Sequence, residues 1–224
     1  MYKIKDIINK VHCADCLGFM KTLPDNSVDL VLTDPPYGME FQSNYRIKKY
    51  DAIENDNNLN WLPSFVEEAK RITKDDSHLY IFCSFHNIDI FKQEIQKHFN
   101  IKNILIWEKN NTGMGDLFGD YAPKYEMIIF CSNGAKKLNG SRDANIIKAS
   151  KTGNIFHPTE KPVELIKYLI SKSSKENDII LDPFLGSGTT AVACQNLHRN
   201  FIGIEISEKY CEIARDRLRQ QTLL

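Results

Sequence analysis

Residues 178–205 read DIILDPFLGSGTTAVACQNLHRNFIGIE and contain two apolar segments with a helical pattern between them. The segments 178–181 and 200–204 are typical of buried strands, and residues 189–197 are typical of a helix. A strand, a crossover helix and a second strand predict neighbouring parallel strands in a doubly wound sheet. The glycine-containing loop after the first strand then lies at the carboxyl edge, where such sheets bind their ligands.

This loop, from Asp182 to Thr189, predicts a site for an adenosine-containing ligand. Gly186 and Gly188 let the backbone turn tightly and approach a ligand closely. Glu205 ends the second strand, where an acid accepts hydrogen bonds from both ribose hydroxyls. The sequence has neither G-x-G-x-x-G nor a P-loop, so a nicotinamide or a nucleoside triphosphate is less favoured. The alternative is a plain glycine turn without a ligand.

A second polar motif, Thr33-Asp34-Pro35-Pro36-Tyr37, follows another apolar strand at residues 28–32. Its position at a carboxyl edge lets it face the same crevice as the glycine loop. The two prolines keep the backbone extended and have no N–H groups, so the carbonyl oxygens point outward as acceptors. Asp34 adds a carboxylate, and Tyr37 adds a flat ring.

These acceptors suit the exocyclic amine of a nucleobase, which is a weak nucleophile because its lone pair is delocalised into the ring. Asp34 and the Pro35 carbonyl would each accept one amine hydrogen and localise the lone pair, while Tyr37 stacks on the base. A sulfonium methyl group in line would then be attacked directly, with catalysis by positioning and electrostatics. The alternative is a proline-rich turn that only ends a strand.

The remaining pattern extends the same architecture over the whole chain. Strands are expected at 78–83, 101–107 and 125–131, and helices at 61–72, 88–99, 163–171 and 208–220. No helical pattern separates the strands 101–107 and 125–131, which predicts that they pair as an antiparallel hairpin. We therefore expect one α/β domain over residues 1–224, with a single doubly wound, mostly parallel sheet.

The composition predicts no overall attraction to nucleic acid. The 224 residues include 29 Lys+Arg and 29 Asp+Glu, so any contact with DNA requires a local basic surface. No apolar run approaches the roughly 20 residues of a membrane span, and the N-terminus lacks the apolar stretch of a signal peptide, so we expect a cytoplasmic protein. Cys13 and Cys16 form a C-x-x-C without a second ligand pair, and we expect no metal site.

Two irregular segments, 38–60 and 135–156, contain basic residues that suit contacts with phosphates, although solvated surface is the alternative for each. Long loops in a compact domain are usually functional or disordered. We expect both to be mobile without DNA and to face Asp34. The first would close over the target, and the second would be a short DNA-recognition segment. The candidate DNA contacts are Arg46, Lys48, Lys49, Lys136, Lys137 and Arg142.

Together these motifs resemble the amino-group DNA methyltransferases, in the β arrangement with the catalytic motif before the cofactor motif. Asp34-Pro35-Pro36-Tyr37 is similar to the D-P-P-Y of that family, and Asp182 to Gly188 is similar to its F-x-G-x-G loop. The resemblance implies a Rossmann-like methyltransferase fold, S-adenosylmethionine as cofactor, and methylation of N6 of a flipped-out adenine in double-stranded DNA. It also implies a restriction–modification setting. Because the chain after Glu205 supplies only a helix, residues 10–13 would provide the third strand of the cofactor half.

The resemblance also implies a role for each motif residue. The catalytic residues would be Asp34, Pro35, Pro36 and Tyr37. Asp15 would meet the adenine of the cofactor, and the segment with His157, Pro158, Lys161 and Pro162 would enclose its methionine end. The remaining cofactor-binding residues would be Asp182, Phe184, Gly186, Ser187, Gly188, Thr189 and Glu205.

Alternative targets stay open at this point. N4 of cytosine is the first, although the family usually pairs S-P-P-Y with cytosine, and an amine of RNA is the second. A glutamine side chain is disfavoured, because related motifs for that target have Asn in place of Asp34. A catalytically silent nucleic-acid-binding module is disfavoured because both motifs are intact. Since the recognition segment is short, we expect a homodimer to cover the duplex.

Overall fold

The computed structural model describes residues 3–37, 58–113, 118–153, 156–157 and 159–221. The loop expected at 38–60, with Arg46, Lys48 and Lys49, therefore lies almost entirely outside the described residues, and Pro158 lies outside them too. None of the described helices combines the length and the apolar character that a membrane span requires.

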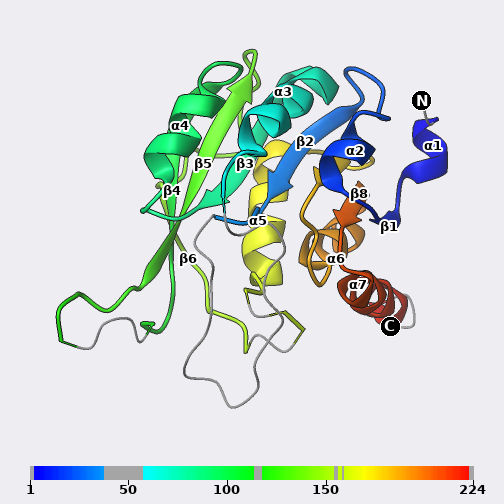
Figure 1. Ribbon diagram of the computed structural model, residues 1–224. Helices are drawn as coiled ribbons and strands as arrows, with labels where there is room; N and C mark the ends of the chain where they lie inside the picture. The colour runs from blue at the N-terminus through cyan, green and yellow to red at the C-terminus, as the bar shows by residue number, and fades with distance from the viewer. Residues whose placement is uncertain (1–2, 38–57, 114–117, 154–155, 158, 222–224) are drawn as a thin grey trace.

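The described residues form an eight-stranded sheet in the order β1-β8-β7-β2-β3-β5-β4-β6 (Figure 1). Neighbours from β1 to β3 are parallel, β5 is antiparallel to β3 and β4, and β6 is parallel to β4. This confirms the doubly wound, mostly parallel sheet with an antiparallel hairpin strand. The strands are β1 Lys10–Cys13, β2 Val28–Thr33, β3 Thr73–Cys83, β4 Asn100–Glu108, β5 Tyr125–Asn133, β6 Ile146–Lys148, β7 Ile179–Asp182 and β8 Asn200–Glu205.

Helices cover both faces of the sheet, because successive apolar side chains of the central strands point to opposite faces. Val31 belongs to the core on one face, and its neighbours Leu30 and Leu32 belong to the core on the other. The first face is covered by α1 Ile4–Ile7, α2 Cys16–Met20, α3 Leu62–Ile72 and α4 Ile88–Ile95. The second face is covered by α5 Val163–Ser173, α6 Thr189–Asn196 and α7 Glu208–Gln221.

Most of the predicted bounds agree with the structure within a few residues. β3 begins earlier than expected, at Thr73, and α4 ends earlier, at Ile95. The strand expected at residues 10–13 is β1, which pairs in parallel with β8. The prediction that residues 135–156 are irregular throughout is wrong, because β6 pairs with residues 106–108 of β4. Three residues are too few to produce a periodic signal in the sequence.

β7 and β2 are neighbours in the sheet although they are far apart in the sequence. The chain continues from β7 into α6 on one face and from β2 toward α3 on the other. Ligands bind at such a switch point, in the crevice beyond the carboxyl ends of the strands. The two ends are joined directly, since Thr33 Oγ1 donates to Asp182 Oδ1 at 2.9 Å. The Asp34-Pro35-Pro36-Tyr37 motif and the glycine loop therefore lie side by side.

Candidate active site

A cavity of about 720 Å³ opens beside the ends of β2 and β7. Small-molecule sites commonly have volumes of roughly 300–1,000 Å³. The two sequence motifs share this one cavity, whereas Gly188 and Pro162 do not line it. The predicted site residues that line it are Asp15, Asp34, Pro35, Pro36, Tyr37, His157, Lys161, Asp182, Phe184, Gly186, Ser187, Thr189 and Glu205.

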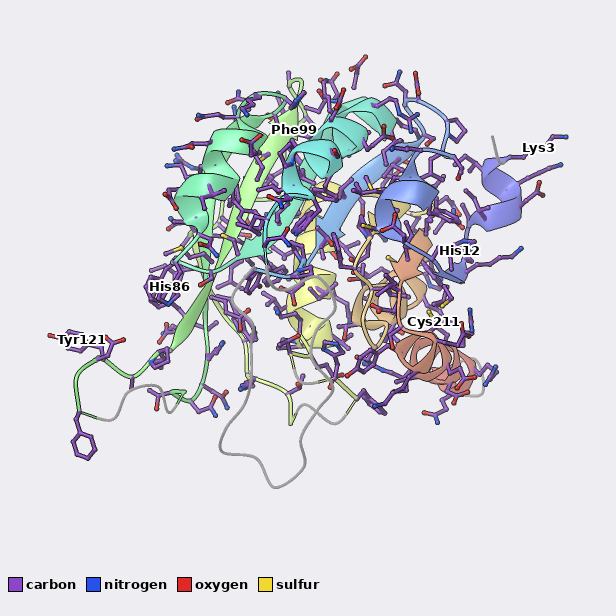
Figure 2. The ribbon with its side chains drawn as sticks, viewed as in Figure 1. Lys3, His12, His86, Phe99, Tyr121 and Cys211 are labelled. Carbon is purple, nitrogen blue, oxygen red and sulfur yellow. The ribbon has the colours of Figure 1, made fainter. Side chains whose placement is uncertain are left out.

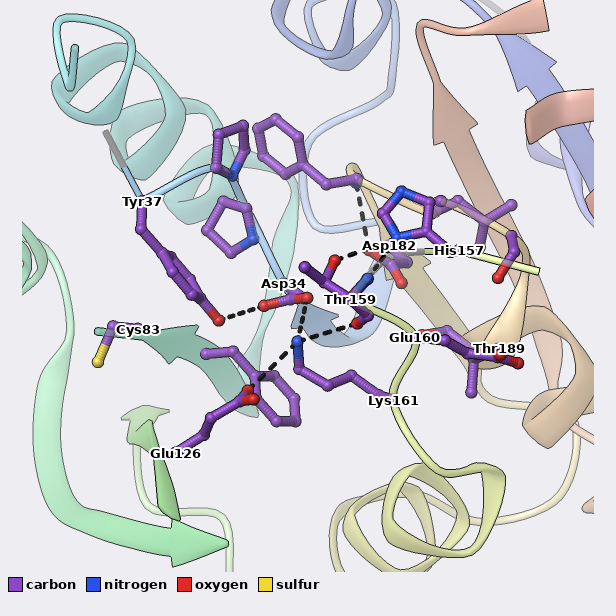
Figure 3. Close-up of a pocket in the computed structure, with 18 of the residues that line it drawn as sticks. Asp34, Tyr37, Cys83, Glu126, His157, Thr159, Glu160, Lys161, Asp182 and Thr189 are labelled. Carbon is purple, nitrogen blue, oxygen red and sulfur yellow. Dashed lines mark hydrogen bonds and ion pairs between the residues drawn. The ribbon is translucent and has the colours of Figure 1, made fainter. Parts of the chain in front are cut away.

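The carboxylate of Asp34 is held by two side chains (Figure 3). The hydroxyl of Tyr37 donates a hydrogen bond to Oδ1, and the ammonium group of Lys161 donates to Oδ2. The backbone of the motif is also held, because Asn87 Nδ2 donates to the Tyr37 carbonyl at 2.5 Å. A carboxylate can accept about four hydrogen bonds, so Asp34 retains acceptor capacity for a ligand in the cavity. Tyr37 therefore orients Asp34 in addition to presenting its ring.

Lys161 lies at Asp34, whereas the resemblance placed it at the methionine end of the cofactor. Its ammonium group lies between two carboxylates, and Nζ is 3.3 Å from Glu126 Oε2. Lys109 pairs with the other oxygen of Glu126 at 2.7 Å. The four side chains form a row of alternating charges, Asp34–Lys161–Glu126–Lys109, which we call the charge row. Its formal charges sum to zero.

Sequence reasoning missed Glu126 and Lys109. Glu126 lies in β5 opposite Trp107, and Lys109 directly follows β4. The available signal was a carboxylate near the start of an otherwise apolar strand. Nothing in the sequence connects that carboxylate to Asp34, because only the pairing of β5 with β3 brings it to this edge of the sheet.

In the charge row, burial and the neighbouring opposite charges shift the pKa values of Asp34 and Lys161 in opposite directions. Removal from water raises the pKa of Asp34, Lys161 opposes the rise and Glu126 adds to it, and the net pKa is above the ordinary value. Burial disfavours the charged form of Lys161, but the attraction of the two carboxylates outweighs burial and raises its pKa. Burial and the nearby Asp34 raise the pKa of Tyr37 well above the ordinary value, so its hydroxyl stays a donor.

At the glycine loop, the backbone fixes the carboxylate of Glu205. Gly186 N donates to Oε2 at 2.8 Å, and Ser207 N donates to Oε1 at 2.9 Å. Gly186 has a φ of 55°, and the nearest atom to a Cβ built there would be in the ring of His157, at 3.7 Å. The loop thus presents an open backbone beside an oriented acid, which fits a nucleoside with two ribose hydroxyls.

Gly188 has the positive φ that the expected tight turn requires, but it is also required for a second reason that the sequence did not show. Its φ is 89°, and a Cβ there would lie 2.7 Å from the Cβ of Ala214 in α7. Gly188 does not line the cavity, so the structure gives no support to the expectation that it lets the backbone approach a ligand. The missing side chain allows the start of α6 to pack closely against α7.

Arg217 on α7 joins the glycine loop to the segment before α5, and sequence reasoning missed it. Its Nη1 donates to the carbonyl of Ser187 at 2.9 Å, and its Nη2 pairs with Glu160 at 3.1 Å. The guanidinium group also lies over the ring of Phe156, 4.6 Å from the centroid. Both charged side chains are at most 10% exposed, so the pair is buried. No local pattern in the sequence connects these two segments.

Three more predicted residues define the wall near the glycine loop. Burial raises the pKa of Asp182 to about 6, against hydrogen bonds from Thr190, Thr33 and the Phe184 backbone. Burial lowers the pKa of His157 to about 4, so its ring is neutral at pH 7. Asp15 caps α2, since its Oδ2 accepts from Gly18 N at 2.6 Å. With Glu205, the two aspartates give this wall three carboxylates, which suit a ligand that carries positive charge.

Lys136 and Lys137 lie away from Asp34. They lie at the end of the sheet where β3 begins, whereas Asp34 lies at the end where the parallel strands finish. The carbonyl of Lys136 is 3.1 Å from His78 Nε2, and His78 pairs with Ser132 near the end of β5. Because β5 is antiparallel to β3, the chain leaves it at the edge where β3 begins. The expectation that the whole segment 135–156 faces Asp34 is therefore wrong for these two lysines.

Later residues of the same segment return to the edge at which Asp34 lies. Lys148 is in β6, opposite Glu108 at the end of β4, and Lys151 lines the cavity. Arg142 precedes Asp143, which pairs with Lys172 near the end of α5 at 2.9 Å. The segment thus crosses from one edge to the other, and Lys148 and Lys151 are its basic residues nearest the candidate site.

Exposed aromatic rings occur in the wall of the cavity and on the loop between β4 and β5. Phe85 and Tyr125 line it and are 54% and 45% exposed. The ring of His86 contacts that of Phe85 at 3.8 Å, and Tyr121 lies on the hairpin loop that extends away from the sheet (Figure 2). Flat rings of this kind suit stacking on nucleobases.

Comparisons with known proteins agree with this geometry. A family model of N6/N4 methyltransferases, described as DNA methylase, matches residues 28–216. The type II methyltransferase M.HinfI of Haemophilus influenzae is 31% identical, over 97% of this chain and 70% of that protein. The DNA adenine methyltransferase YhdJ of Escherichia coli (strain K12) is 30% identical, over 91% of this chain and 80% of that protein. The crystal structure of the M1.HpyAVI–SAM complex has a TM-score of 0.73 and 28% identity, and the match covers 93% of this chain and 98% of that one.

Proposed function

The chain belongs to the N6/N4 family of DNA methylases, and on that basis we propose that it methylates N6 of adenine in double-stranded DNA. The cofactor of this family is S-adenosylmethionine. The observation that carries the proposal is the shared cavity, which Asp34 enters from the end of β2 and the glycine loop enters from the end of β7. A methyl donor and an amine acceptor bound to these two walls would meet in one space.

The wall at the glycine loop fits the cofactor. We assign the ribose hydroxyls to Glu205, which two backbone amides orient, and the adenine ring to Asp15. We assign Asp182 and His157, which line the same cavity, to the methionine end, because a carboxylate and a neutral ring suit a positively charged ligand. When bound, S-adenosylmethionine supplies a sulfonium methyl group, whose carbon–sulfur bond breaks, leaving the electron pair on sulfur, as the nitrogen–carbon bond forms.

Asp34 acts on the target amine in this proposal. Its carboxylate and the Pro35 carbonyl each accept one amine hydrogen, which localises the lone pair on the attacking nitrogen. The nitrogen must then lose one proton, which Asp34 or a water molecule accepts. Tyr37 keeps Asp34 oriented through its hydroxyl and offers its ring to the base. Positioning and electrostatics supply the catalysis, and no covalent nucleophile is required.

A base stacked in a duplex cannot present its amine in line with the methyl group, so the proposal includes a flipped-out base, at a cost of a few kcal/mol. Two observations favour adenine as that base. The catalytic motif begins with Asp34, as is usual for adenine in the family that it resembles, and the relative YhdJ is named as an adenine methyltransferase. The family model also includes N4 enzymes, which makes N4 of cytosine the second candidate.

Methyl transfer from tritiated S-adenosylmethionine tests this proposal when DNA, RNA and protein are offered in parallel. We expect label in DNA, and nucleoside mass spectrometry should identify N6-methyladenine. N4-methylcytosine as the only product would replace adenine with cytosine. Label confined to RNA or protein would overturn the assignment to DNA.

A further inference from the structure

Lys161 and Glu126 have no task in the transfer described above, although both are charged and shielded from solvent. Their side chains are 8% and 24% exposed. Charges in such positions are costly unless partners compensate for the lost hydration. Here each oxygen of Glu126 lies within ion-pair distance of a different lysine, Lys161 at 3.3 Å and Lys109 at 2.7 Å. The charge row ends on Asp34, the group that meets the target amine.

We propose that Lys161 and Glu126 are positioning residues with different tasks: Lys161 holds Asp34 as an oriented carboxylate anion at neutral pH, and Glu126 helps to fix Lys161 in place. This inference rests on the proposed function, in which Asp34 accepts hydrogens of the target amine. A protonated Asp34 would carry a hydroxyl donor on one oxygen and would lose the negative charge that makes the carboxylate a strong acceptor. It would also be unable to take the proton that the methylated nitrogen loses.

The contacts of Lys161 explain how Asp34 is oriented. Besides Asp34 and Glu126, Lys161 Nζ contacts the carbonyl of Thr159 at 3.3 Å and lies 5.1 Å from the centre of the Phe82 ring (Figure 3). The ammonium group is therefore fixed on several sides and holds Oδ2 in one place. The hydroxyl of Tyr37 holds Oδ1 in the same way, so the carboxylate has one orientation in the cavity.

Besides Lys161, four groups from different segments face Asp34, and all four are neutral or negative. They are Tyr37 after β2, Cys83 at the end of β3, Glu126 in β5 and Asp182 at the end of β7. Among the described residues, Lys161 is the cation that pairs with Asp34. Without its charge, a shielded Asp34 would be left with two negative neighbours, and its pKa would rise further.

Glu126 acts in the opposite direction on the same carboxylate. Its negative charge raises the pKa of Asp34, while its contact helps to fix Lys161. Lys109 limits that effect, because it pairs with Glu126 from the other side. Removing the charge of Glu126 would leave Lys161 paired with Asp34 alone, so the pKa of Asp34 would fall. The two residues therefore predict pH shifts of opposite sign.

The test compares Lys161→Met, Lys161→Arg and Glu126→Gln with the wild type, and Lys97→Gln is the matched control. Lys97 also pairs with a carboxylate, Glu94, but it does not line the cavity. Single-turnover methyl transfer is measured against pH, so that product release does not mask the chemical step. Infrared titration of the enzyme without substrate reports protonation of the Asp34 carboxyl, which is identified by its loss in Asp34→Asn.

In Lys161→Met, we expect the acid limb of the rate profile to move to higher pH by about 1–3 units. An opposite charge at this distance lowers the pKa of a carboxyl by that amount, and the variant loses it. In Glu126→Gln the acid limb should move to lower pH. In Lys161→Arg it should lie close to that of the wild type, and in Lys97→Gln it should not change. The infrared titration should show the same shifts. An equal loss of rate at every pH in Lys161→Met, with an unchanged infrared titration, would overturn the inference. If the wild type methylates no nucleic acid, the proposed function fails, and the infrared shifts still decide the charge of Asp34.

Discussion

Asp34 and Glu205 lie on the same cavity, but different kinds of group hold them. Side chains hold Asp34, through the hydroxyl of Tyr37 and the ammonium group of Lys161. Backbone amides hold Glu205, through Gly186 and Ser207. Because these four partners are different residues, we expect the two carboxylates to be removable independently, with separable effects.

Asp34→Ala should lower single-turnover methyl transfer by roughly 10²–10⁴-fold, the usual range for a group that handles a proton in the transition state. Binding of S-adenosylmethionine, measured by calorimetry, should change little, because Asp34 is assigned to the amine. Glu205→Ala should weaken cofactor binding, because Glu205 is assigned to the ribose hydroxyls. Equal losses of cofactor affinity in the two variants would contradict this division of roles.

Side chains whose chemistry is local could be predicted from the sequence, whereas their partners could not. Asp34 and Glu205 each end a strand with a recognisable motif, and the rule for doubly wound sheets places both at one edge. The contacts of Lys161 with Asp34 and Glu126 join three segments that are distant in the sequence. Such contacts depend on side-chain directions at the edge of the sheet, which no spacing in a single sequence encodes.

At the scale of elements, α7 packs against the glycine loop and holds its backbone. The close approach of Ala214 to Gly188 and the contacts of Arg217 with Ser187 and Glu160 come from this helix. The helix itself was predictable from its pattern. Its support of the loop was not, because the periodicity shows which face is apolar but not which loop lies against it.

Arg217→Met should lower the free energy of unfolding by roughly 3–5 kcal/mol, because Glu160 is left as an unpaired buried charge. It should also weaken binding of S-adenosylmethionine by about 2- to 10-fold, the equivalent of one hydrogen bond lost from Ser187. Chemical denaturation and calorimetry measure the two effects.

The double variant Arg217→Met, Glu160→Gln is the control for this interpretation. It should recover part of the lost stability, since no buried charge is then unpaired. Losses that simply add in the double variant would show that the pair is not energetically coupled.

Strand pairing explains where prediction of the elements succeeded and failed. The hairpin of β4 and β5 was expected, because no helical pattern separates the two strands. The sequence did not indicate what this hairpin means for the position of residues 135–156. An antiparallel β5 carries the chain to the far edge, so Lys136 begins there, and the short β6 then brings Lys148 back.

At the scale of the whole molecule, a net charge of zero means that contacts with phosphates depend on local basic residues, and the sheet has such residues at both edges. Lys148 and Lys151 lie at the edge with the cavity, and Lys136 and Lys137 lie at the opposite edge. Phosphate contacts supply much of the affinity of DNA-binding proteins and make it depend on salt. If the target base enters the cavity as proposed, the flanking duplex should contact the edge at which Asp34 lies.

The double variant Lys148→Glu, Lys151→Glu should therefore weaken DNA binding across all sequences and flatten its salt dependence. Each phosphate contact adds about 0.9 to the slope of log affinity against log salt, so losing both contacts should lower the slope by about 2. The matched variant Lys136→Glu, Lys137→Glu makes the same change of charge at the opposite edge and should leave the slope nearly unchanged. Fluorescence anisotropy over a series of salt concentrations measures both. A flattened slope in the matched variant alone would place the DNA on the far edge, and an equal flattening in both would indicate a general effect of net charge.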